Sequence, residues 1–152
     1  MKVKEIVAKE IVSGITGFGL SIATSFLGGW DNLLKYMVLL VICDYVLGII
    51  NASVFKHSNK TENGGLSSKA GFRGMVKKLV IFMFIGLMQQ TDNVLGTNNF
   101  LRNTVIYGFM VNELISIVEI VGLMGVVNLP PVITDAIELL KEKSNIDTKD
   151  IK

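Results

Sequence analysis

The stretch that decides the fold is LRNTVIYGFMVNELISIVEIVGLMGVV, residues 101–127. A helix rises about 1.5 Å per residue, so roughly 20 residues cross a bilayer core of about 30 Å. This mostly apolar stretch is long enough, and we expect a membrane-spanning helix at 103–127. It nevertheless carries Asn112, Glu113 and Glu119. An acid at that depth costs about 2.5 kcal/mol or more unless it faces protein or water, so the helix needs a polar surface beside it.

The polar residues of this helix fall on one side of it. At about 100° per residue, Gly108, Asn112, Ser116 and Glu119 lie within roughly 60° of arc, with Glu113 beside them. Two interpretations stay open for the acids: hydrogen bonds within one monomer, or contacts that line a pore or join copies of the chain. Glu119 could also be hydrated near the inner boundary. The residues that we consider for an oligomer or pore surface are Asp44, Gly48, Asn112, Glu113, Ser116 and Glu119.

The composition also indicates a membrane protein and gives no sign of an enzyme. Half of the 152 residues are hydrophobic, the mean hydropathy is +0.52, and the length suits one domain. The single cysteine, Cys43, and the single histidine, His57, cannot form a zinc cluster or a pair of nucleophile and base. No glycine-rich phosphate loop is present. We therefore expect no catalytic residue, cofactor or metal, and the net charge of +2 indicates no nucleic-acid partner.

Three further apolar stretches precede the deciding one. A first span is expected at 11–28, although its basic start also fits a signal peptide. A second is expected at 33–55, and a third at 75–91, for which a re-entrant or interfacial helix is the alternative. Short amphipathic helices are expected at both ends of the chain, at 1–10 and 132–143. The predicted fold class is an all-α integral membrane protein with three to four transmembrane helices and short amphipathic terminal helices.

Two of these spans carry faces suited to helix packing. In the second span, Asp44 shares a face with Met37, Leu40, Gly48 and Asn51. The first span has a stripe of small residues, the pattern by which membrane helices approach closely. Its packing partner is left open. The stripe consists of Gly14, Gly17, Ser21, Thr24 and Gly28.

Charge sets the predicted orientation. The connection 56–78 holds six basic residues against one acid, and loops rich in Lys and Arg stay in the cytoplasm. The basic loop at 56–74 and the tail at 130–152 would then be cytoplasmic, as would both termini. The short connections at 28–32 and 92–100 contain no Lys or Arg and would lie outside. The residues expected to set topology and contact anionic lipid are Lys69, Arg73, Lys77 and Lys78.

Several short motifs follow one another in a recognisable order. They are Gly28-Gly29-Trp30-Asp31, Asp44-Tyr45-x-x-Gly48, the run Leu66-Ser67-Ser68-Lys69-x-Gly71-Phe72-x-Gly74-x-x-Lys77-Lys78, and Asn112-Glu113-x-Ile115-Ser116-Ile117-x-Glu119, with Leu101-Arg102 and Pro130-Pro131. In this order the chain resembles the phage lysis and toxin-secretion holins of Gram-positive bacteria and their phages, over about residues 28–141. Two features depart from the family pattern: a longer loop at 56–66, and the first 27 residues, which the resemblance does not cover.

The resemblance implies a non-enzymatic protein of the bacterial cytoplasmic membrane. Such proteins self-associate and open lesions through which a cell-wall hydrolase, or in some members a toxin, leaves the cell. The implied partners are further copies of the chain, the lipid bilayer, the hydrolase or toxin, and an antiholin. Two other functions stay open: a small ion channel or proton-coupled carrier with Asp44 and Glu113 as a relay, and a membrane scaffold or secretion accessory that makes no hole.

Overall fold

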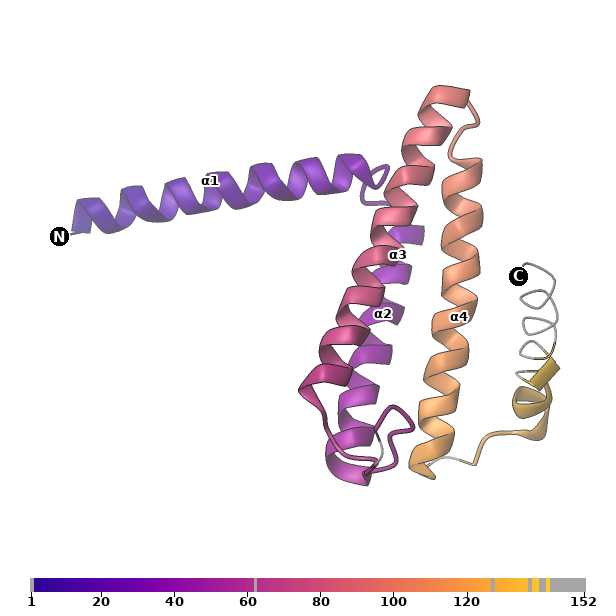
Figure 1. The fold of residues 1–152 in the computed structure, drawn as a ribbon. Helices are drawn as coiled ribbons and strands as arrows, with labels where there is room; N and C mark the ends of the chain where they lie inside the picture. Colours follow the sequence, from indigo (N-terminus) through magenta and orange to yellow (C-terminus); the bar gives the residue numbers. More distant parts are fainter. Residues whose placement is uncertain (1, 62, 127, 137, 140–141, 143–152) are drawn as a thin grey trace. The chain divides into compact units, whose positions relative to one another are not determined.

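The chain is built of long helices, and the residues described contain no strand (Figure 1). The computed structural model describes residues 2–61, 63–126, 128–136, 138–139 and 142. The predicted all-α fold is confirmed. Much of the cytoplasmic tail predicted at 130–152 lies outside the described residues. The elements are α1 (Lys2–Phe26), α2 (Asn32–Ile50), a π-helical turn η1 (Asn51–Phe55), α3 (Ser68–Leu95) and α4 (Phe100–Met124).

Three stretches of helix are long and apolar enough to cross a membrane. They are Glu5–Phe26, Asn32–Phe55 and Phe100–Met124, which correspond to the first, second and fourth expected spans. Helix α3 is longer than any of them but is not in this group. Arg73, Lys77 and Lys78 make its first half too polar. A crossing by α3 at 75–91 therefore stays a prediction.

Two helix boundaries differ from the expectation for physical reasons. The sequence suggested a short surface helix at 1–10 followed by a separate span, whereas α1 is one continuous helix. No Gly or Pro separates the two parts, so nothing interrupts the hydrogen-bond ladder there. At the other end, α4 stops before the expected residue 127. Gly125, with φ of 66°, ends it in the left-handed conformation typical of a residue just beyond a helix.

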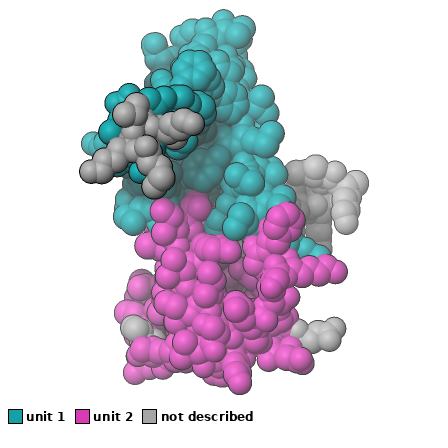
Figure 2. Space-filling view, turned by 90° about the vertical axis from the view of Figure 1, so that its left-hand side faces the viewer, with its two compact units in different colours: residues 1–39, 73–110 teal, residues 40–72, 111–152 magenta. Residues whose placement is uncertain are grey.

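The chain divides into two compact units, coloured separately in Figure 2. Unit 1 comprises residues 1–39 and 73–110, and unit 2 comprises residues 40–72 and 111–152. Unit 1 holds both of the connections expected outside the membrane, and unit 2 holds residues 56–72 of the basic loop 56–74. The fully buried apolar residues of unit 1 are Leu34, Met37, Ile85 and Ile106, and the buried apolar residues of unit 2 are Leu40, Ala52 and Ile120.

Large apolar side chains also cover the outside of the helices. On α1, Ile15, Phe18 and Leu20 are each about two-thirds exposed, and α2, α3 and α4 carry similar residues. A water-soluble chain rarely exposes so much contiguous apolar surface. Exposed apolar flanks around a few buried polar groups are what a helical membrane protein requires.

Candidate functional site

Two polar clusters lie within the helices, one in each unit. The first, which we call the Asp44 cluster, belongs to unit 2 and consists of Asp44 and Ser116, with the buried Glu113 one turn before Ser116 on the same helix. The Ser116 hydroxyl on α4 donates a hydrogen bond to Oδ1 of Asp44 on α2. Asp44 is 5% exposed and Glu113 is 4% exposed. The two acids that the sequence singled out are therefore both shielded from the surroundings of the monomer.

Helix geometry explains which side of each helix faces inward. The second-span face predicted from periodicity is buried at Met37, Leu40, Asp44 and Asn51. On α4 six buried or half-buried positions at intervals of three or four residues lie within about 80° of arc. They are Arg102, Ile106, Phe109, Glu113, Ser116 and Ile120.

This buried side of α4 is not centred on the predicted polar stripe. Asn112 and Gly108 are exposed and Glu119 is half-buried, while Ser116 of that stripe donates a hydrogen bond to Asp44. Gly48 lies close to Ile120, where a Cβ would make ordinary van der Waals contact. Of the six predicted surface residues, the structure thus brings Asp44 and Ser116 together and leaves Asn112 facing outward.

The small-residue stripe of α1 has a different environment. A Cβ at Gly14 or Gly17 would meet nothing within 4 Å, and Ser21 is exposed. The Thr24 hydroxyl donates to the carbonyl of Leu20 in its own helix, at 2.9 Å. Among these five residues, Gly28 alone packs on other elements. Packing of the stripe therefore stays a prediction, and within the described chain Gly14 and Gly17 have no neighbour.

The basic residues of α3 lie largely at the surface. Lys69, Arg73 and Lys77 are exposed at a spacing of four residues, which places them on one side of the helix, and Lys78 is half-buried. Ser67 stands before the helix with its Oγ 3.5 Å from the amide nitrogen of Ala70, so it occupies the capping position of α3. A role of these bases in topology and lipid contact stays a prediction.

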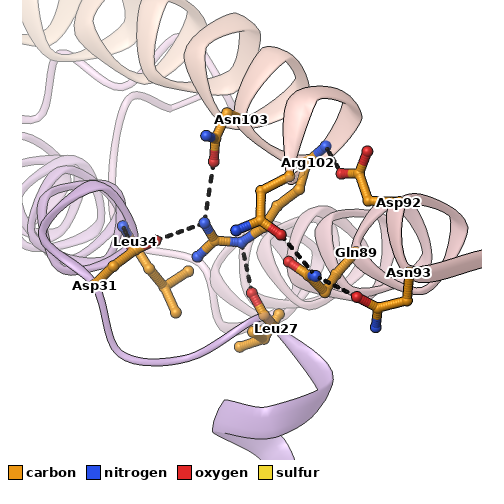
Figure 3. A network of polar contacts seen from close by, with 9 residues as sticks. Leu27, Asp31, Leu34, Gln89, Asp92, Asn93, Arg102 and Asn103 are labelled. Atoms are coloured by element: carbon orange, nitrogen blue, oxygen red, sulfur yellow. Dashed lines mark hydrogen bonds and ion pairs between the residues drawn. The ribbon is translucent and has the colours of Figure 1, made fainter. Parts of the chain in front are cut away.

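The second cluster was not predicted as a site. We call it the Arg102 clasp, and it belongs to unit 1 (Figure 3). Arg102, in the first turn of α4, is fully buried. Its Nη1 donates to Oδ2 of Asp31 at 2.6 Å, and its Nε donates to the carbonyl of Leu27 at 2.6 Å. One guanidinium therefore joins the chain just after α1, the start of α2 and the start of α4.

Two aspartates of the clasp cap helices. Asp31 accepts a hydrogen bond from the amide of Leu34 at 2.8 Å, so it is the N-cap of α2. Asp92, near the end of α3, accepts from the amides of Leu101 and Arg102 at 3.0 and 2.8 Å and from the Thr97 hydroxyl. A carboxylate at a helix N-terminus is also favoured by the helix dipole.

These contacts lower the pKa of both carboxyl groups. For Asp31 the main cause is the hydrogen bond from Arg102, which outweighs partial burial. For Asp92 burial acts to raise the pKa, but the hydrogen bonds from Thr97, Arg102 and Leu101 together outweigh it. Both groups are therefore held in the charged form by the folded chain.

Gly28 allows the clasp to close. Its φ is 87°, and a Cβ there would overlap the side-chain amide of Gln89 and lie 2.9 Å from Nε of Arg102. Gln89 in turn donates from Nε2 to the side-chain oxygens of Asn93 and Asn99, each at 3.0 Å. Only glycine suits both the backbone conformation and the close approach.

The sequence did contain signals for the clasp. Asp31 precedes α2 by one residue, the position of an N-cap. Arg102 is a lone base near the N-terminal end of the stretch 101–127. That end was expected to lie on the outer side of the membrane. Its pairing with Asp31 depends on residues 71 positions apart, a contact that periodicity cannot indicate.

Comparison with known proteins decides the family. The sequence model of the bacteriophage holin family matches residues 21–142. The chain belongs to the bacteriophage holin family. This family permeabilises membranes and is not enzymatic, so the chain is a membrane protein and not an enzyme. The match begins at residue 21, within α1, and so starts slightly earlier than the resemblance inferred from residue 28 onward.

Individual relatives cover most of the chain. An uncharacterised protein of Listeria monocytogenes is 37% identical over 134 residues, which are 88% of this chain and 89% of that protein. An uncharacterised protein of Halalkalibacterium halodurans is 34% identical over 128 residues, 80% of this chain and 88% of that protein. A protein of Bacillus phage phi105 described as a probable holin is 28% identical over 130 residues, 86% of this chain and 90% of that protein. No solved structure matches the chain.

Proposed function

We propose that the chain is a lesion-forming holin of the bacterial cytoplasmic membrane. Copies of it associate in the bilayer and open holes through which a cell-wall hydrolase or a toxin leaves the cell. The match to the bacteriophage holin family over residues 21–142 carries the proposal. The similarity to a probable phage holin supports it.

The distribution of polar groups is compatible with such a role. In the monomer Asp44 and Glu113 are shielded, while Gly14, Gly17 and Asn112 face outward. The shielded acids need no other copy to tolerate the membrane. The outward small and polar residues offer surfaces on which further copies could pack. In this proposal assembly uses the outward residues first, and the acids line the lesion after it opens.

The proposed membrane topology follows from the charges. Both termini and the basic loop 56–74 lie in the cytoplasm, and the connections 28–32 and 92–100 lie outside. Arg102 is a base near the outer side, but Asp31 neutralises it within the clasp. The bilayer, further copies of the chain and the exported hydrolase or toxin are the proposed partners, and an antiholin would act through the same assembly.

The proposal is tested by expression in a bacterial host together with a muralytic enzyme that lacks its own export signal. The native chain should reach the membrane, after which the enzyme should appear in the medium and the culture should lyse. Asp135→Asn, which changes an exposed residue outside both clusters, serves as the control. Accumulation of the native chain without release of the enzyme would contradict the proposal.

A further inference from the structure

The Arg102 clasp has no part in the proposed lesion itself, yet it holds the largest fully buried side chain of the described residues. A buried guanidinium is tolerated only when its charge and its N–H groups are compensated. Here Nε and Nη1 bond to Leu27, Asp31 and Asn103, while Nη2 has no hydrogen-bond partner among the described residues. The compensation is therefore incomplete. Asp31 forms the direct ion pair with the guanidinium, and the nearby Asp92 carboxylate also attracts it.

The carboxylate of this direct ion pair is partly exposed to water. The side chain of Asp31 is 44% exposed, whereas Arg102 is 0% exposed. The oxygens of Asp92 accept from Thr97 and from the amides of Leu101 and Arg102, so they are engaged at the start of α4. No titratable residue lies between Leu27 and Asp31, and Lys35 on α2 is exposed. If Asp31 leaves, the guanidinium loses its ion-pair partner and its buried position becomes unfavourable.

The same guanidinium fastens α1. Among the described contacts, α1 meets the rest of unit 1 only around its last turn. The Phe26 ring lies against Gly86, the Phe26 carbonyl accepts from Gln90 at 3.1 Å, and the Leu27 carbonyl accepts from Arg102. Movement of Arg102 away from its buried position would break the hydrogen bond from its guanidinium to the Leu27 carbonyl. The clasp thus links the Asp31–Arg102 pair to the attachment of α1.

We propose that the Asp31–Arg102 pair is a lock that holds α1 in place and sets the time at which the lesion opens. The inference rests on the proposed lesion-forming function. In it Arg102 is a positioning residue: it does not line the lesion, but it delays the step by which α1 is released. Weakening the pair should therefore advance opening rather than prevent it.

Asp31→Asn tests the lock without removing the helix cap. Asn caps helices about as well as Asp, so the bond to Leu34 should survive while the ion pair is lost. A half-exposed pair is weak, and its loss should shorten the time to lysis by about two- to five-fold at equal amounts of membrane protein. Asp135→Asn, which also removes one exposed carboxylate, should lyse on the native schedule.

Trp30 gives a second measurement that is independent of lysis. It is the only tryptophan, it precedes Asp31, and it is half exposed. In the full-length protein reconstituted in lipid vesicles, acrylamide should quench Trp30 more strongly in Asp31→Asn than in the native chain. In the native chain, balanced salt on both sides of the vesicle should increase the same quenching, because salt screens exposed ion pairs.

The outcomes separate the lock from the lesion. Earlier lysis with stronger quenching supports the lock. Stronger quenching without release by any variant keeps the lock but contradicts the lesion-forming function. Native lysis timing and native quenching in Asp31→Asn overturn the lock. If Asp31→Asn does not accumulate, the native chain alone provides the test. Acrylamide quenching of its Trp30 that does not change with salt then overturns the lock.

Discussion

At the level of single residues, ionisable side chains are buried among apolar helices in two different settings. Glu113 is almost fully buried near the middle of α4, and Asp44 accepts a hydrogen bond from Ser116. Arg102 is fully buried at the start of the same helix, where Asp31 balances it. Residues of the first kind are candidates for the lesion. Those of the second kind fix the connection after α1 to the first turns of α2 and α4.

Glu113→Gln tests the first kind. Gln keeps the shape and the hydrogen-bonding capacity of the side chain but removes its charge. If the charge is needed in a water-filled lesion, the variant should insert normally and lyse later than the native chain, or not at all. Glu113→Leu should also insert and should fail more completely. Blots of the membrane fraction and assays of released muralytic enzyme measure both effects, and release on the native schedule by both variants would exclude Glu113 from the hole.

The pH dependence of unfolding tests the second kind. Because the folded chain lowers the pKa of Asp31 and Asp92, their contribution to stability is present above the ordinary carboxyl value of 3.8. It is lost as the pH falls through the lowered values. Thermal unfolding of the detergent-solubilised protein, followed by Trp30 fluorescence, should therefore occur at lower temperature below about pH 3.8. Asp31→Asn should show a smaller acid effect than the native chain, and an identical acid effect would contradict the assignment.

The buried faces of α2 and α4 differ in how well helical periodicity predicts them. Periodicity identified the buried face of α2 through Met37, Leu40 and Asp44, because apolar and acidic residues at helical spacing leave little choice. For α4, periodicity predicted a polar stripe that does not coincide with the buried side of the helix. Gly108 and Asn112 are small or polar enough to face outward, so their spacing alone does not determine the packing. The clasp depended on pairing between residues distant in sequence.

At the level of helices, α1 differs from the other helices in how little of it is buried. It is long and apolar enough to span a membrane, yet its described side chains are exposed along almost its whole length. Helix α3 is the reverse case: it has buried positions at Ile85, Gln89 and Asp92 but carries the basic residues that keep it from qualifying as a span on hydropathy. The sequence predicted both helices, and the crossing of the membrane by α3 stays a prediction.

Gly17→Leu tests whether α1 packs on another copy. A Cβ at this position meets nothing within 4 Å, so the substitution should leave the fold of the monomer intact. Leu also favours a helix over Gly by roughly 0.5–1 kcal/mol. Any loss of association must then come from blocked approach between copies. Crosslinking in membranes should give oligomers for the native chain and fewer for Gly17→Leu. Equal crosslinking would mean that the small-residue stripe is not the contact surface.

At the scale of the whole molecule, the account predicts four crossings with both ends inside. The charge pattern favours this, because the base-free connections alternate with the basic loop. In a Cys43→Ala background, a cysteine at Asn98 should react with a membrane-impermeant thiol reagent on intact cells, and one at Lys60 should not. Asn98 and Lys60 are both exposed, so burial does not explain a difference between them. The reverse labelling pattern would invert the topology.

The central claim is that this chain opens holes large enough for a folded protein. The most direct measurement uses vesicles that contain both a small ion-sensitive dye and a folded muralytic enzyme, with the purified full-length chain added to the lipid. A lesion should release the enzyme together with the dye signal, a channel or carrier should change only the dye signal, and a scaffold should change neither. A lesion-forming chain should therefore place active enzyme outside the vesicles. Ion leakage with the enzyme fully retained would contradict it.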